Sequence, residues 1–97
     1  MMANALTPDA ISTALASLNG WALDGDKLVK TYVFGNFREA VSFIVRIGFA
    51  AEELNHHPEL YNVYNRVRVE LTTHDVGNKV TDLDVSLATA IEGFSWV

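Results

Sequence analysis

The sequence predicts an α+β fold in which three helices pack on one face of a four-stranded antiparallel sheet, in the order α-β-β-α-β-β-α. Segments with apolar residues at helical spacing alternate with pairs of short segments rich in Val, Thr and Tyr. The two strands of each pair are separated by only a few turn-forming residues, which is typical of hairpins. Because the chain has 97 residues and 49% are hydrophobic, we expect a single domain over residues 1–97.

The first helix and the first hairpin have clear boundaries. Thr7 is expected to cap the helix, Pro8 to take its first position and Gly20 to close it in the left-handed conformation. Residues 21–23 and 27–34 then predict two strands around an Asp-Gly-Asp turn.

The second helix is predicted over residues 37–54, with Asn36 as its cap. It carries two apolar stripes, the first made of Phe37, Val41, Ile44, Gly48 and Ala51 and the second of Phe43, Ile47, Ala50 and Leu54. One stripe is enough to cover a sheet, so the other predicts a subunit interface, and we expect the second stripe to be the exposed one. A helix enclosed within its own domain explains the pattern nearly as well.

The second hairpin and the third helix complete the fold. Residues 60–64 and 67–73 are predicted as strands joined by a turn at residues 65–66. Apolar and polar residues alternate along the second of these strands, which indicates that one of its faces is buried. Thr81 and Asp84 predict a capping box at the start of the third helix.

Composition excludes several classes of protein. The formal net charge is −5, and the seven Lys and Arg residues are spread along the chain, so we expect no nucleic-acid partner. There is no cysteine, which excludes a disulfide framework and a thiolate metal site. The chain has no apolar run of about 20 residues, and its start (Met1-Met2-Ala3-Asn4) does not resemble a signal peptide. We therefore expect a cytoplasmic protein with no membrane partner.

The three histidines are the candidate catalytic residues. His56 and His57 are adjacent near the predicted end of the second helix, and His74 follows a predicted strand, so all three are expected beside a cleft. Histidine can both donate and accept a proton near neutral pH. Glu52 lies four residues before His56, on the same face if the helix extends that far, where its carboxylate would orient the imidazole and favour the imidazolium.

Simpler interpretations exist for each of these features. An adjacent histidine pair before Pro58 is more often only a helix end, and capping alone accounts for Asp84. Three histidines and a carboxylate could also bind zinc, although adjacent histidines point in different directions on a regular backbone.

In combination these features resemble the pterin-4a-carbinolamine dehydratases. The resemblance covers essentially the whole chain and is carried by Glu52-x-x-x-His56-His57-Pro58, by Tyr64, by Thr72-Thr73-His74-Asp75 and by Leu83-Asp84. Leu60 departs from the family pattern, in which tryptophan follows Pro-Glu.

The resemblance implies a dehydratase that converts 4a-hydroxytetrahydrobiopterin to quinonoid dihydropterin and water during recycling of the tetrahydropterin cofactor. It implies that the catalytic residues are His56, His57 and His74, that the substrate-binding residues are Asn55, Thr72, Thr73 and Asp75, and that Glu52 and Asp84 support them. Neither a metal nor a cofactor is expected, because the reaction needs only an acid and a base.

The resemblance also implies assembly, as a homodimer or a homotetramer. The alternative function is a non-catalytic module that binds a pterin or mediates protein dimerisation, with the apolar second helix as its docking surface.

Overall fold

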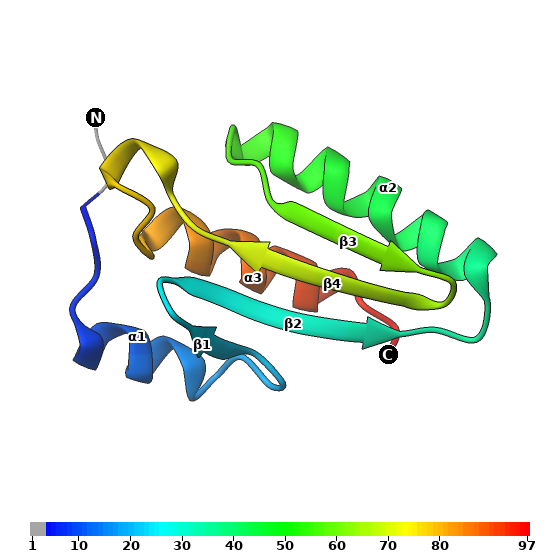
Figure 1. Ribbon diagram of the computed structural model, residues 1–97, viewed down its shortest axis with the longest axis horizontal. Coiled ribbons are helices and arrows are strands. Elements are labelled where there is room, and N and C mark those ends of the chain that lie inside the picture. The colour runs from blue at the N-terminus through cyan, green and yellow to red at the C-terminus, as the bar shows by residue number, and fades with distance from the viewer. Residues whose placement is uncertain (1–3) are drawn as a thin grey trace.

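The computed structural model describes residues 4–97 and has the predicted order of elements (Figure 1). The elements are α1 (Pro8–Leu15), β1 (Ala22–Asp24), β2 (Lys27–Val33), α2 (Phe37–Leu54), β3 (Glu59–Val63), β4 (Arg66–Leu71), the short 3-10 helix η1 (His74–Val76) and α3 (Asp82–Phe94). The expectation about a signal peptide rested partly on residues 1–3, which lie outside the described residues. No helix within residues 4–97 combines the length and the apolar character needed to cross a membrane.

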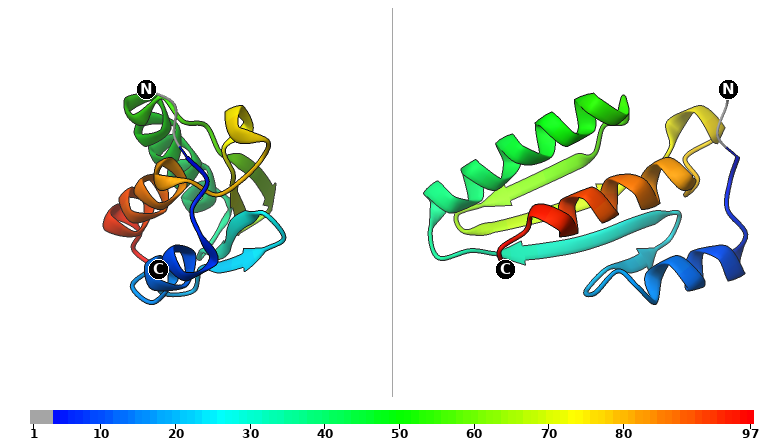
Figure 2. Two further views of the ribbon diagram at one scale, coloured as in Figure 1. Left: turned by 90° about the vertical axis from the view of Figure 1, so that its left-hand side faces the viewer. Right: turned by 180° about the vertical axis from the view of Figure 1, so that it is seen from behind.

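The four strands form one antiparallel sheet in the order β1-β2-β4-β3. Figure 2 shows the α-helices on one side of this sheet, while the other face is uncovered. Val67, Val69 and Leu71 of β4 are fully buried, as the alternation predicts. The predicted α+β fold is therefore confirmed.

The prediction of which stripe of α2 is exposed was wrong. Phe43 and Ile47 are fully buried, and the Phe43 ring packs against Tyr32 of β2 with the ring centroids 4.7 Å apart. The large exposed apolar residues of α2 are spaced four apart, and they are Phe37, Val41, Val45 and Phe49. The sequence could not decide this point, because large side chains occur on both sides of the helix and only their fit to the sheet selects the buried side.

Several boundaries differ from the predictions, and those of β1, β2 and β3 differ by one residue at one or both ends. α1 ends at Leu15. After it, the backbone N–H groups of Ser17 and Leu18 bond to carbonyls three residues earlier, which tightens the chain and places Leu18 in the core. Gly20 is left-handed, with φ 83°, but it belongs to the later turn that precedes β1. The second hairpin turns at residues 64–65, and β4 ends at Leu71.

Candidate active site

A cavity of about 370 Å³ lies where the end of α2 meets the segment that follows β4. Its lining residues come from two stretches of chain and from the start of α3, and they are Asn55, His56, His57, Pro58, Glu59, Thr72, Thr73, His74, Asp75 and Leu83. The structure thus gathers in one cavity the three histidines and the four residues predicted to bind substrate. Glu52 and Asp84 are not among the lining residues.

The end of α2 sends the two adjacent histidines in different directions. Asn55 caps the helix in the left-handed conformation, with φ 50°, a conformation that asparagine tolerates better than most residues. The chain therefore leaves the helical path before His56, which is buried and only 8% exposed, whereas His57 is exposed. Both side chains still line the cavity.

His56 is held by Asp84 at the start of α3. Its Nε2 lies 2.5 Å from Oδ1 of Asp84, and this carboxylate is fully buried. Because an ionised carboxylate can only accept, it selects the ring form of His56 that carries hydrogen on Nε2. Within residues 4–97, Nδ1 of His56 has no hydrogen-bond partner, so this nitrogen remains available for proton transfer.

Asp84 is also the capping residue that the sequence predicted. Its Oδ2 accepts a hydrogen bond from the backbone N–H of Thr81 at 2.9 Å, which confirms the capping box. The same oxygen accepts from the hydroxyl of Thr73 at 2.8 Å. A buried carboxylate needs such donors to offset its lost hydration. Asp84 therefore joins α3, the segment after β4 and His56 in one hydrogen-bonded unit.

The expected pairing of Glu52 with His56 was wrong, because Glu52 contacts His57. Nε2 of His57 lies 2.7 Å from Oε1 of Glu52, and both side chains are well exposed. The expectation assumed that α2 continues through residue 56, whereas the left-handed Asn55 ends it at Leu54.

His74 lines the same cavity from the segment that follows β4. It is the first residue of η1, and the chain around it is closed by an isolated bridge between Thr73 and Lys79. Its side chain is exposed, and no side chain within residues 4–97 hydrogen-bonds its ring. The ring of His74 is thus open to a ligand in the cavity, while that of His56 is held in place.

Some polar side chains of the cavity wall already make hydrogen bonds within the protein. Thr72 is buried, and its hydroxyl donates to the backbone carbonyl of Asp26 at 3.0 Å, so a ligand finds this oxygen as an acceptor. Asn55 and Asp75 are exposed at the cavity. The cavity therefore combines proton-transfer groups with hydrogen-bonding groups and is well suited to a small polar heterocycle.

Sequence reasoning missed Pro58, Glu59 and Leu83 as lining residues. The signal for Glu59 was its place directly after the His-His-Pro run, which carries it along the same wall. In the part of the chain that the structure describes, no three His, Cys, Asp or Glu side chains are grouped as metal ligands.

Comparison with known proteins gives one consistent family. The model of the family described as "Pterin 4 alpha carbinolamine dehydratase" matches residues 4–94. A protein of Opitutus terrae, provisionally named as a pterin-4-alpha-carbinolamine dehydratase, is 57% identical over 96 residues, covering 99% of each chain. A Rhizobium rhizogenes protein with the same provisional name is 53% identical, with 90% of this chain and 87% of that protein covered.

A solved structure is similar in three dimensions as well. It is described as a transcriptional coactivator/pterin dehydratase from Brucella melitensis, and it superposes with a TM-score of 0.87 at 39% sequence identity. The match covers 93% of this chain and 97% of that one.

Proposed function

This chain belongs to the pterin 4 alpha carbinolamine dehydratase family, and we propose that it removes water from 4a-hydroxytetrahydrobiopterin or a related 4a-hydroxytetrahydropterin. The product is a quinonoid dihydropterin, which a reductase can return to the tetrahydropterin cofactor. The observation that carries the proposal is the presence of His56, His57 and His74 around one cavity.

The reaction explains why histidines are suitable. The lone pair of the ring nitrogen beside the carbinol carbon expels the hydroxyl as a carbon–nitrogen double bond forms. The departing hydroxyl takes up a proton and leaves as water, and the ring nitrogen loses its own proton. The protein must therefore hold the pterin and supply one acid and one base, each worth about 10²–10⁴-fold in rate.

We assign the acid and base roles to His56 and His74, which line the cavity from different segments of the chain. Asp84 supports His56 in this role, because a buried carboxylate at 2.5 Å stabilises the imidazolium that forms when Nδ1 takes a proton. His74 has no protein partner for its ring within residues 4–97 and can turn toward the substrate. The stereochemistry of the hydroxylated carbon decides which of the two protonates the leaving hydroxyl.

The remaining residues of the site bind or position. His57, steadied by Glu52, assists at the exposed side of the cavity. Asn55, Thr72, Thr73 and Asp75 surround the histidines and offer amide, hydroxyl, carboxylate and backbone groups to the N–H and C=O edges of a pterin. No step of this mechanism requires a metal or a second cofactor.

We also propose that the protein is a homo-oligomer, a homodimer or a homotetramer. The support is the exposed apolar stripe of α2, defined by Phe37, Val41, Val45 and Phe49, with exposed fractions of 40–75%. A patch of this kind on a 10.7 kDa subunit favours self-association. The cytoplasmic location expected from the sequence stays a prediction.

The same stripe supports the second candidate function, a non-catalytic module that binds a pterin or mediates dimerisation. This alternative merits a test because the similar protein of Brucella melitensis is described as a transcriptional coactivator as well as a pterin dehydratase. The two candidates differ in turnover, because a binding module would bind pterin without accelerating loss of water.

A stopped-flow assay on enzymatically generated 4a-hydroxytetrahydrobiopterin tests the proposal. We expect the purified protein to accelerate formation of the quinonoid product, and the double variant His56→Ala/His74→Ala to lose this acceleration. A wild-type protein that binds pterin but leaves the dehydration rate unchanged would support the binding module instead.

A further inference from the structure

Glu59 lines the candidate site, although neither the proposed chemistry nor the family resemblance gives it a role. It is the first residue of β3 and follows Pro58 directly. The ten lining residues, all within residues 4–97, include two carboxylates, from Glu59 and Asp75, and neither Lys nor Arg. The lining residues thus contribute two carboxylates to the cavity, and the one cation within residues 4–97 that contacts them, Lys27, lies outside the lining.

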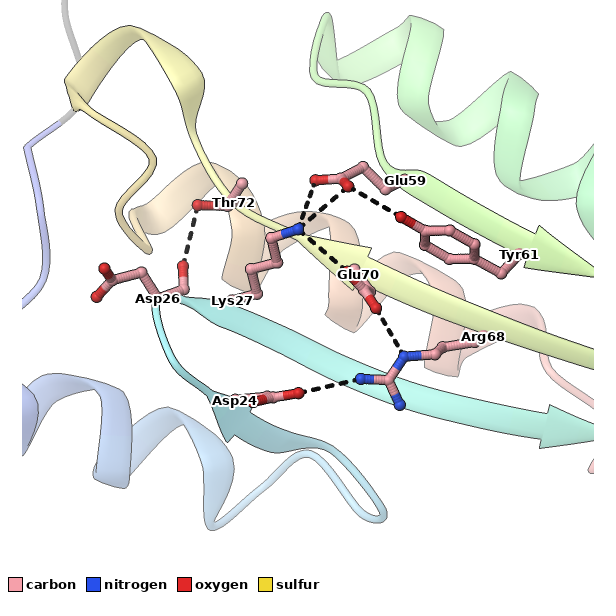
Figure 3. Close-up of polar contacts among 8 residues, drawn as sticks. All are labelled: Asp24, Asp26, Lys27, Glu59, Tyr61, Arg68, Glu70 and Thr72. Carbon is pink, nitrogen blue, oxygen red and sulfur yellow. Dashed lines mark hydrogen bonds and ion pairs between the residues drawn. The ribbon is translucent and has the colours of Figure 1, made fainter.

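Lys27 holds the carboxylate of Glu59 in place from β2 (Figure 3). Nζ of Lys27 lies 3.1 Å from each of the two carboxylate oxygens of Glu59. The hydroxyl of Tyr61 donates to the same carboxylate at 3.3 Å. Because a carboxylate oxygen has more than one acceptor position, both oxygens of Glu59 keep unused acceptor positions.

Lys27 itself is shared between two carboxylates. Glu59 of β3 stands directly opposite Glu70 of β4, a placement in which like charges repel. Nζ of Lys27 is 3.1 Å from Oε1 of Glu70 as well, so one ammonium compensates both residues. The hydrogen bond with Glu59 is the largest cause of the raised pKa of Lys27, which keeps the ammonium charged. The charge of Lys27 is thus balanced by these two carboxylates on the open face of the sheet.

The network around Lys27 keeps a net negative charge. Arg68 donates to Glu70 at 2.7 Å and to Asp24 at 3.2 Å, as Figure 3 shows. The hydrogen bond from Arg68 holds the pKa of Glu70 below its usual value, so Glu70 stays ionised near neutral pH. The network contains three carboxylates and two cations, and the charge left over is one negative unit.

We propose that Glu59 is a specificity-determining residue, which selects uncharged pterins and rejects pterins that carry a carboxylate or a phosphate. This inference rests on the proposed function, since it assumes that a pterin occupies the cavity. An anionic substituent would be repelled by the carboxylate of Glu59, which Lys27 and Tyr61 hold in place, and by the exposed carboxylate of Asp75. Lys27 would not attract it, because the charge of Lys27 is already balanced by Glu59 and Glu70.

The size of the effect follows from the exposure of the pair. The side chains of Lys27 and Glu59 are 35% and 33% exposed, so water and salt screen the interaction with a ligand only in part. Removing the charge of Glu59, if it contacts the ligand, should then change the affinity for an anionic pterin relative to a neutral one by about tenfold. We expect the discrimination to weaken as the salt concentration rises.

A pair of fluorescent probes tests the inference without the dehydration reaction. Pterin-6-carboxylate and 6-hydroxymethylpterin share the ring system and differ in charge at neutral pH. Quenching titrations give a dissociation constant for each, and their ratio measures discrimination against the anion. The variants are Glu59→Gln, which keeps the shape and an acceptor for Lys27, and Asp24→Asn, which removes the same charge from the network away from the cavity.

We expect the wild type to prefer the neutral probe, Glu59→Gln to reduce that preference about tenfold, and Asp24→Asn to leave it within about twofold. Lys27→Gln should increase the preference for the neutral probe, because it removes the ammonium that balances Glu59 and Glu70. An unchanged ratio in Glu59→Gln, or an equal change in Asp24→Asn, would overturn the inference while the proposed function stands. A wild type that binds neither probe would overturn the inference, and the dehydration assay would then decide the proposed function separately.

Discussion

Nε2 of His56, from the segment after α2, lies 2.5 Å from Oδ1 of Asp84, in the first turn of α3. These residues are 28 positions apart in the chain and are both buried. The second oxygen of Asp84 closes the capping box of α3 and also accepts from Thr73. The residue that completes the capping box of α3 is therefore also the residue that orients a candidate catalytic base, and this double role shapes the first two predictions.

The single variants His56→Ala and His74→Ala should each lower kcat by about 10²–10⁴-fold, since each removes one proton-transfer group. Their stabilities should differ. His74 is exposed, so its removal should leave the urea midpoint unchanged, whereas His56→Ala leaves Oδ1 of Asp84 buried without its partner and should cost about 1–3 kcal/mol. Stopped-flow kinetics and urea unfolding measure the two effects. Near-wild-type rates in both variants would sink the assignment.

Asp84→Asn should cost less activity than either histidine change. The amide oxygen can still accept from Thr81 and Thr73, so the capping box survives. The amide nitrogen, however, is a donor and faces His56, which favours the wrong ring form and gives no charge to stabilise an imidazolium. Loss of all activity at unchanged stability would show that Asp84 takes part directly.

Glu92 offers a test of stability at acid pH. It accepts from Lys30 at 2.8 Å, from Trp21 at 3.3 Å and from the hydroxyl of Tyr32. Burial pulls the pKa of Glu92 upward, but the hydrogen bonds from Lys30 and Tyr32 outweigh it and leave the pKa below its usual value.

A lowered pKa in the folded state means that Glu92 contributes stability above about pH 4.3, its value in the unfolded chain, and that this contribution is lost as the pH falls through the folded pKa. Glu92→Gln should therefore lower the free energy of unfolding at pH 7 by about 1–3 kcal/mol and flatten its decline below pH 5. Urea titrations at several pH values check this, with the exposed Glu53→Gln as the control. Parallel acid profiles for wild type and Glu92→Gln would contradict it.

Two substitutions on α2 separate assembly from folding. Val45 is 52% exposed and Ile47 is fully buried, although they are two positions apart on the same helix. Val45→Glu should dissociate the oligomer and leave a folded subunit, whereas Ile47→Glu should unfold the protein because it buries a charge in the core. Light scattering and circular dichroism distinguish the outcomes. A wild-type mass near 10.7 kDa at micromolar concentration would end the oligomer proposal.

Glu52→Gln should change kcat less than threefold and leave stability within about 0.5 kcal/mol, because exposed ion pairs contribute little. Glu52 pairs with His57, and the side chains of His57 and Glu52 are 62% and 76% exposed. A drop in kcat as large as that of His74→Ala would place Glu52 in the proton-transfer machinery.

The sequence by itself determined the order of the elements and identified seven of the ten residues that line the candidate site. Apolar periodicity, the caps at Thr7, Asn36 and Thr81, and the two hairpins suffice for the order of the elements, because they depend on residues close together in the chain. The spacing of Glu52, His56, His57, His74 and Asp84 likewise indicated the family before any contact was known.

Only the tertiary structure decided which partner each of these residues has and which side of α2 faces the sheet. A single left-handed residue, Asn55, turns His56 away from Glu52 and toward Asp84, and local propensity does not specify that rotation. Phe43 rather than Phe37 is buried because its ring fits against Tyr32 of β2 and against Phe34, the residue that follows β2. Lys27 contacts the carboxylate of Glu59 from 32 residues earlier in the chain, because the strand order β2-β4-β3 places both residues across the same sheet.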